Sequence, residues 1–283
     1  MTPVATLLRV EHACVRYALR GTGLFAPSRS LDALSDVSID IAQGGRLGVV
    51  GESGSGKSTL ARVVLGLVRA SSGRVLWDGR PVDYSDADAL RALRREMQVV
   101  FQDPFGSLDP RMTAGQAVGE ALQALAGPVP SVAAQDRIMA ALSEVGLGAT
   151  YAHRYPHELS GGQCQRVAIA RATVARPRLL VCDEAVSALD VSVQAQIVNL
   201  LHELSERHQM SLLFISHNLA VVRHLCEDIA VLCAGRVVEQ GSRAAIFDNP
   251  QAQYTRDLLA AVPEADPALQ RARIAAARRI RTQ

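Results

Sequence analysis

The chain has 283 residues, and 48% of them are hydrophobic, which is enough apolar material for a folded core. A formal net charge of +2 excludes the strongly basic field of a protein that binds nucleic acid over its whole surface. The five cysteines are scattered and form no C-x-x-C pair, which argues against a disulfide framework or a zinc site and favours a reducing cytosol.

No stretch approaches the roughly 18 apolar residues that a membrane-spanning helix needs, and the N-terminus has no apolar signal core. We therefore expect any membrane role to depend on partner chains. Five arginines lie between Arg271 and Arg281. We interpret this run as a solvated face, with contact to a membrane or an anionic partner as the alternative.

The chain opens with two runs rich in apolar and β-branched residues, 7–17 and 33–50, separated by a loop at 21–30. They predict a small sheet region. The second run leads into a complete G-x-x-x-x-G-K-[ST] pattern followed by a further hydroxyl residue: Gly51, Glu52, Ser53, Gly54, Ser55, Gly56, Lys57, Ser58 and Thr59.

This pattern predicts a phosphate-binding loop between a strand and a helix that runs from Lys57 to about Leu67. A chance glycine-rich turn is the alternative, but the apolar run before the loop and the apolar periodicity after it match the required context. Lys57 is the only lysine of the chain. Its compact ammonium can reach between the β- and γ-phosphates, and the backbone N–H groups of the loop can hold the other oxygens.

The remaining chain alternates strands and helices, with a mostly helical stretch at about 113–158. Strands are predicted at 74–77, 97–101, 179–182, 211–216, 229–233 and 236–238, and helices at 161–175 and 191–208. This alternation predicts a mainly parallel α/β core with a helical insertion. Beyond Asn249 and Pro250 we expect a helical extension. No internal repeat is evident.

The strand predicted at 179–182 ends in two carboxylates, Asp183 and Glu184. Successive side chains of a strand diverge, so the two can act separately. Asp183 would bind Mg²⁺, and Glu184 would orient and deprotonate an attacking water. Together with the phosphate loop, this pair predicts nucleotide hydrolysis.

The pentapeptide Leu159-Ser160-Gly161-Gly162-Gln163 opens a predicted helix and resembles the signature of the ATP-binding-cassette (ABC) ATPases. The other motif residues of that family occur in the expected order along the chain. Tyr17 and Gln102 precede the pentapeptide, and the segment 187–190, which ends in Asp190, and His217 come after it. The resemblance covers about residues 7–245. It implies a P-loop NTPase (RecA-like) α/β core with an N-terminal antiparallel β subdomain and a helical insertion at about 103–158, all within an ATPase domain at 1–245. Residues 246–283 would form a C-terminal helical extension.

The resemblance also implies roles for single residues. Tyr17 would stack on adenine, the loop and Lys57 would bind ATP, and Ser58, Gln102 and Asp183 would bind Mg²⁺. Glu184 would be the catalytic base, His217 would contact the γ-phosphate, and Gln102 would transmit motion to the insertion. Ser160, Gly161, Gly162, Gln163 and Asp190 would complete the site of a second chain in a head-to-tail dimer. Taken alone, His217 could be an ordinary core or surface histidine and Gln102 a loop glutamine.

The runs 101–112 and 249–259 resemble the dipeptide, oligopeptide and nickel importer ATPases of bacteria. That branch implies two ATPase subunits, identical or homologous, two permease subunits and an extracytoplasmic binding protein, with this chain peripheral at the cytoplasmic face of the inner membrane. Ala185-Val186 departs from the commoner Pro-Thr, which leaves peptide and nickel substrates both open. No cysteine follows Cys233, so no iron–sulfur centre is predicted.

Two other functions remain as alternatives. An ABC ATPase that acts on nucleic acid or ribosomes would usually carry a long coiled-coil insertion or two fused cassettes, and this sequence has neither, so no nucleic-acid partner is expected. An exporter ATPase is disfavoured by the run 105–112 and by the sequence around Tyr254.

Overall fold

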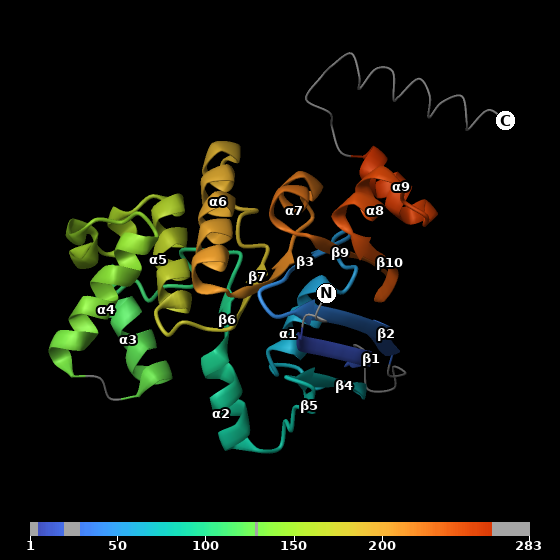
Figure 1. Cartoon of the computed structure of the whole chain (residues 1–283), viewed down its shortest axis with the longest axis horizontal. Helices are drawn as coiled ribbons and strands as arrows, with labels where there is room; N and C mark the ends of the chain where they lie inside the picture. The colour runs from blue at the N-terminus through green and yellow to red at the C-terminus, as the bar shows by residue number, and fades with distance from the viewer. Residues whose placement is uncertain (1–4, 20–28, 128–129, 262–283) are drawn as a thin grey trace, which may run out of the picture.

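Two β-sheets of different type form the centre of the molecule, as the computed structural model shows (Figure 1). The structure describes residues 5–19, 29–127 and 130–261. The predicted loop at 21–30 therefore lies mostly outside the described residues, and so does the arginine run at 271–281.

The smaller sheet is antiparallel throughout, with strand order β2-β1-β4-β5. Its strands are β1 (Thr6–Leu19), β2 (Arg29–Ala42), β4 (Ser72–Trp77) and β5 (Arg80–Pro81). This sheet confirms the expected N-terminal antiparallel subdomain.

The larger sheet has six strands in the order β10-β9-β3-β8-β7-β6, and only the β9–β10 pair is antiparallel. Its strands are β3 (Arg46–Val50), β6 (Met97–Val100), β7 (Leu179–Asp183), β8 (Ser211–Ile215), β9 (Asp228–Cys233) and β10 (Arg236–Ser242). The mainly parallel core predicted from the alternation of elements is therefore confirmed. The carboxyl ends of β3, β7 and β8 meet at one edge, where open α/β sheets bind ligands.

The helices lie around these sheets (Figure 1). They are α1 (Lys57–Val64), α2 (Ala87–Glu96), α3 (Ala114–Ala126), α4 (Ser131–Glu144), α5 (Gly161–Thr173), α6 (Val191–His208), α7 (Leu219–Leu225), α8 (Arg243–Asp248) and α9 (Gln253–Ala260). Two short 3₁₀ helices, Ala149–His153 and Pro156–Glu158, complete the expected helical stretch.

The larger sheet separates two hydrophobic cores because successive side chains of a strand point to opposite faces. Val181 and Ile215 pack with α1 and the antiparallel sheet. Cys182 and Phe214 pack with the helical side of the molecule, including α5, α6 and α7. All four are fully buried, which explains why β7 and β8 have continuous apolar sequences instead of an alternating pattern.

Several boundaries differ from the predictions. Helix α1 ends at Val64 instead of Leu67, because Gly66 takes a left-handed φ of 65° and the N–H of Leu67 bonds back to Arg62 O at 2.8 Å. Strand β6 ends at Val100, β10 continues to Ser242, and α5 ends at Thr173. Helices α2, α7 and α8 were not predicted; all three have Asp, Asn or Ser N-caps, which are sequence signals for a helix start.

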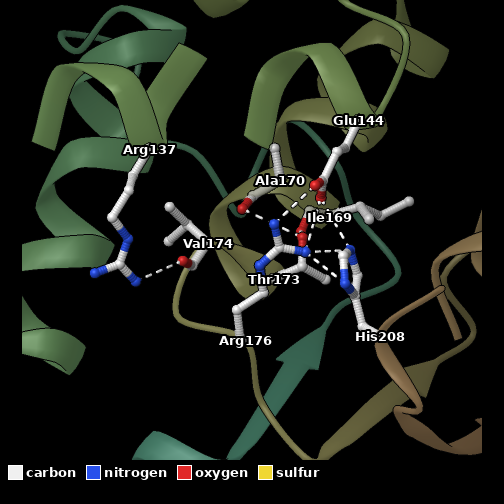
Figure 2. Close-up of polar contacts among 8 residues, drawn as sticks. All are labelled: Arg137, Glu144, Ile169, Ala170, Thr173, Val174, Arg176 and His208. Atoms are coloured by element: carbon white, nitrogen blue, oxygen red, sulfur yellow. Dashed lines mark hydrogen bonds and ion pairs between the residues drawn. The ribbon is translucent and has the colours of Figure 1, made fainter. Parts of the chain in front are cut away.

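The insertion is tied to the core by a charged cluster at the end of α4 (Figure 2). Arg176 Nη2 donates to Glu144 Oε1 at 2.7 Å, and His208 Nε2 lies 3.1 Å from Glu144 Oε2. Arg137, also on α4, donates to the backbone oxygen of Val174 at 3.1 Å. Arg176 precedes β7 and His208 ends α6, so this cluster joins the insertion to two elements of the core.

Among the residues that the structure describes, no helix is both long and apolar enough to cross a bilayer. The domain boundary near residue 245 stays a prediction. The chain passes from β10 directly into α8, and α9 then packs on the same end of the molecule (Figure 1).

Candidate functional site

The loop between β3 and α1 adopts a conformation that only glycine allows at two positions. Gly51 has a φ of 153°, and a Cβ there would lie 2.1 Å from the backbone oxygen of Leu232. Gly56 has a φ of 107°, and its Cβ would lie 2.6 Å from the backbone oxygen of Ala33. The glycine spacing therefore reflects tight backbone packing of the loop against β9 and β2.

Lys57 begins α1 and is 5% exposed. Its Nζ donates to the backbone oxygens of Gly51 at 2.8 Å and Glu52 at 2.7 Å. Burial lowers the pKa of Lys57, and the nearby carboxylates of Glu184 and Asp183 oppose that shift. The side chain is thus folded back along its own loop. The two bonds use two of the three N–H donors of the ammonium group.

Ser58 and Asp183 meet at the end of β7, where Ser58 Oγ donates to Asp183 Oδ1 at 3.0 Å. Burial raises the pKa of Asp183; the Ser58 hydrogen bond opposes this shift and the charge of Glu184 adds to it. A hydroxyl and a carboxylate are hard oxygen ligands of the kind that Mg²⁺ accepts. Within the described residues no group of three or more His, Cys, Asp and Glu side chains is placed to hold a metal ion.

Glu184 and His217 follow the adjacent strands β7 and β8 and face each other. Glu184 Oε1 lies 3.4 Å from His217 Nδ1, and the N–H of Glu184 donates to Ile215 O at 3.0 Å. Glu184 has a φ of 52°, an unusual conformation for a residue other than glycine. This backbone strain and the bond to β8 fix the direction of the carboxylate after the strand.

A cleft of about 710 Å³ opens in front of the loop. Nine predicted residues line it: Tyr17, Ser53, Gly54, Gly56, Lys57, Ser58, Thr59, Gln102 and Glu184. The adenine-stacking candidate, the loop, the metal candidates Ser58 and Gln102 and the proposed base therefore share one cavity.

Other predicted residues lie outside that lining. Gly51, Glu52 and Ser55 belong to the loop but not to the lining, Asp183 bonds to Ser58, and His217 lies beside Glu184. Five residues that the sequence did not reveal also line the cleft: Leu31, Asp32, Ala33, Ala234 and Gly235. They come from β2 and the β9–β10 turn, and only the tertiary fold brings them to the loop, for instance through the 2.9 Å bond from Gly235 N–H to Ser55 O.

The segment Ser160–Gln163 forms the first turn of α5 and is not part of the cleft lining. Ser160 and Gln163 form a reciprocal capping box, with the Gln163 N–H donating to Ser160 Oγ at 3.3 Å and the Ser160 N–H donating to Gln163 Oε1 at 2.9 Å. Ser160 is exposed, and its hydroxyl proton stays available for another acceptor. Asp190 is also exposed, at the N-cap of α6.

The comparison with family models places residues 34–187 in the family described as ABC transporter. The oligopeptide transport ATP-binding protein OppF of Haemophilus influenzae is 43% identical over 94% of this chain and 80% of its own length. The glutathione import ATP-binding protein GsiA of Shigella flexneri is 47% identical over 94% of this chain, which spans 42% of that protein.

A solved structure, described as the dimeric post-hydrolysis state of an ATP-binding cassette bound to ADP and Pi, matches with a TM-score of 0.73 and 29% identity. The match covers 84% of this chain and 99% of the other. The likeness therefore extends over both sheets and the helical insertion.

Proposed function

This chain belongs to the ABC transporter family, and from that membership we propose that it binds and hydrolyses ATP to energise a bacterial importer of dipeptides or oligopeptides. The observation that carries the proposal is that Lys57, Ser58, Gln102 and Glu184 line the same cleft. A cation, two oxygen ligands and a carboxylate base are the groups that phosphoryl transfer to water requires.

ATP would lie with its polyphosphate on the loop from Gly51 to Thr59 and its adenine against Tyr17. Lys57 would exchange its bonds to loop carbonyls for bonds to phosphate oxygens, which are stronger acceptors because they are charged. Ser58, Gln102 and Asp183 would hold Mg²⁺, which neutralises charge on the phosphates when bound.

Glu184 would accept the proton of the attacking water. Its carboxylate needs to point into the cleft, and the backbone conformation after β7 and the nearby His217 favour that orientation. His217, at 57% side-chain exposure, could reach both Glu184 and the γ-phosphate.

The first turn of α5, which begins at the exposed Ser160 and lies outside the cleft lining, supports a head-to-tail dimer. Ser160, Gly161, Gly162 and Gln163 would supply a hydroxyl, N–H groups and the positive end of a helix dipole to ATP on the other chain. Asp190 would lie at the same contact. The dimeric cassette structure with ADP and Pi supports this arrangement.

We infer that the ATPase domain spans 1–245 and that 246–283 form its C-terminal extension. Two permeases would receive the movement of the insertion through Gln102, and a binding protein outside the membrane would deliver the substrate. The chain would then be peripheral at the cytoplasmic face of the inner membrane, with a second ATPase subunit, the same chain or a homologous one, as its partner.

Peptide is favoured over nickel as the substrate because the relatives compared above are named for oligopeptides and for glutathione, itself a tripeptide. ATP hydrolysis by the co-expressed transporter complex in lipid would test this. We expect stimulation when the binding protein carries short peptides. Stimulation only by a nickel chelate would mean that the importer transports nickel instead of peptides. If the chain does not associate with permeases, an importer role is refuted.

A further inference from the structure

A side chain from the C-terminal helix α9 contacts the phosphate loop. The N–H of Glu52 donates to the Tyr254 hydroxyl at 3.2 Å, although 202 positions separate the two residues. Glu52 is the second residue of the loop, so a segment outside the predicted ATPase domain bonds directly to the backbone of the nucleotide site.

The peptide group that Tyr254 contacts is also the one that holds Lys57. The Glu52 N–H and the Gly51 carbonyl belong to the same peptide, and that carbonyl accepts the bond from Lys57 Nζ at 2.8 Å. A peptide group is planar, so a bond on its N–H side also fixes the direction of its C=O side. Tyr254 and Lys57 are therefore joined through one rigid unit.

Helix α9 is anchored well enough to hold the phenol in place. Thr255 is 1% exposed and Leu259 is 8% exposed, and Leu259 belongs to the core on the helical side of the large sheet. The Glu239 carboxylate on β10 accepts the N–H groups of Gln251 at 2.7 Å and Ala252 at 3.0 Å, where α9 begins. A carboxylate at this end also interacts favourably with the helix dipole.

The phenol is neutral at physiological pH. Burial raises the pKa of Tyr254 above its ordinary value, although the bond from the Glu52 N–H opposes that shift. A neutral hydroxyl accepts from Glu52 and keeps its own proton for another partner. Titration therefore does not disturb the contact.

We propose that Tyr254 is a positioning residue for the phosphate loop: its hydroxyl holds the Gly51–Glu52 peptide, and through it Lys57, in the arrangement that receives a nucleoside polyphosphate. Helix α9 thereby sets the affinity of the cleft for nucleotide. This inference rests on the proposed function, because it assumes that the cleft binds ATP. By reciprocity, a bound nucleotide would in turn strengthen the docking of α9.

Tyr254→Phe isolates the contact, because it removes one hydroxyl and leaves the ring to pack. Loss of one neutral hydrogen bond predicts a Kd for Mg-ATP that is about threefold to tenfold higher than in the wild type. The KM for ATP should rise by more than kcat falls. Exchange of the Glu52 amide hydrogen should become faster, which a purely packing role would not cause.

Tyr84→Phe is the matched control. The Tyr84 hydroxyl also bonds to the main chain: it donates to the backbone oxygen of Val63 at 3.1 Å, at the far end of α1 from the loop. We expect this variant to lower stability about as much as Tyr254→Phe does and to bind Mg-ATP as the wild type does.

The outcomes separate the two proposals. A Tyr254→Phe protein that binds Mg-ATP within twofold of the wild type, while Lys57→Ala loses binding, would overturn the inference and leave the proposed function intact. A wild-type protein that does not bind ATP would overturn the proposed function itself. If Tyr254→Phe does not fold, hydrogen exchange of the Glu52 backbone amide in the wild-type protein tests the inference instead. Slow exchange supports the contact with Tyr254, and exchange at the rate of an unstructured amide overturns it.

Discussion

Lys57 shows how a single side chain can be both structural and functional. Its ammonium is almost fully buried and bonds to two carbonyls of its own loop. These bonds hold Lys57 against the loop, and in the proposed function they are exchanged for bonds to phosphate oxygens. The loop is therefore preorganised for an anion, which lowers the cost of binding.

Replacement of Lys57 tests this dual role. We expect Lys57→Ala to lower the affinity for ATP at least about tenfold, because a charge-assisted bond to phosphate is lost. Lys57→Arg should not restore affinity, since a broad planar guanidinium does not replace the compact ammonium that reaches between the phosphates. Equilibrium binding of Mg-ATP measures both effects. Wild-type affinity in Lys57→Ala would contradict the assignment of the loop.

Replacement of Glu184 tests the chemical step of ATP hydrolysis separately from ATP binding. Glu184→Gln keeps the shape and the strained backbone but cannot accept a proton, so hydrolysis should fall by about 10²-fold or more while ATP binding persists. A single-turnover assay with labelled ATP measures the step. Asp32→Asn, at another carboxylate of the cleft lining, is the control and should retain hydrolysis. Normal turnover in Glu184→Gln would refute its role as the base.

Among the elements, α4 determines how the helical insertion is held. Glu144 at its end is bonded to Arg176 and His208 from the core (Figure 2). Arg137 adds a bond to the end of α5. In the proposed function the insertion moves with the nucleotide state, and such a motion would strain these contacts.

Glu144→Gln should destabilise the protein by about 1.5–3 kcal/mol near neutral pH, the usual value of a hydrogen bond to a charged group. The Glu144 pKa is lowered: burial opposes the shift, and the bonds from Arg176 and His208 outweigh it. A lowered folded-state pKa contributes stability above the unfolded value, and that stability is lost as the pH falls through the folded value.

The difference in unfolding free energy between wild type and Glu144→Gln should therefore shrink as the pH is lowered below about 4.3, the unfolded value of a glutamate. Urea denaturation at a series of pH values measures it. Glu203→Gln, at an exposed position of α6, is the control and should show little change. A pH-independent difference between Glu144→Gln and the wild type would contradict the ionic character of the cluster.

The elements also show what the sequence could predict and why the rest was missed. The strand, loop and helix around Lys57 and the two carboxylates after β7 are local patterns, and each could be placed within a few residues. The early end of α1 depended on Gly66 taking a left-handed conformation, which no periodicity reveals. The Ser58–Asp183 and Tyr254–Glu52 bonds join residues 125 and 202 positions apart, so they depend on the tertiary fold.

At the scale of the whole molecule, the site is divided between two surfaces. The cleft is lined by the loop and Glu184, whereas Ser160–Gln163, of which Ser160 is exposed, lie at the start of α5 outside the cleft lining. In the proposed function, a second chain therefore completes each ATP site. A two-fold symmetric, isologous contact, in which each loop faces the first turn of α5 of the other chain, gives two equivalent sites in one dimer.

The most direct test of this composite ATP site is complementation between two variants. Lys57→Ala damages the loop side, Ser160→Arg damages the signature side, and each protein alone should be nearly inactive as an ATPase. In a mixed dimer, the intact phosphate loop of the Ser160→Arg chain faces the intact signature segment of the Lys57→Ala chain. We predict that an equimolar mixture recovers hydrolysis, with about a quarter of all sites intact on random pairing. No recovery in a mixture shown to form mixed dimers would mean that each chain builds its site alone, which would contradict the account.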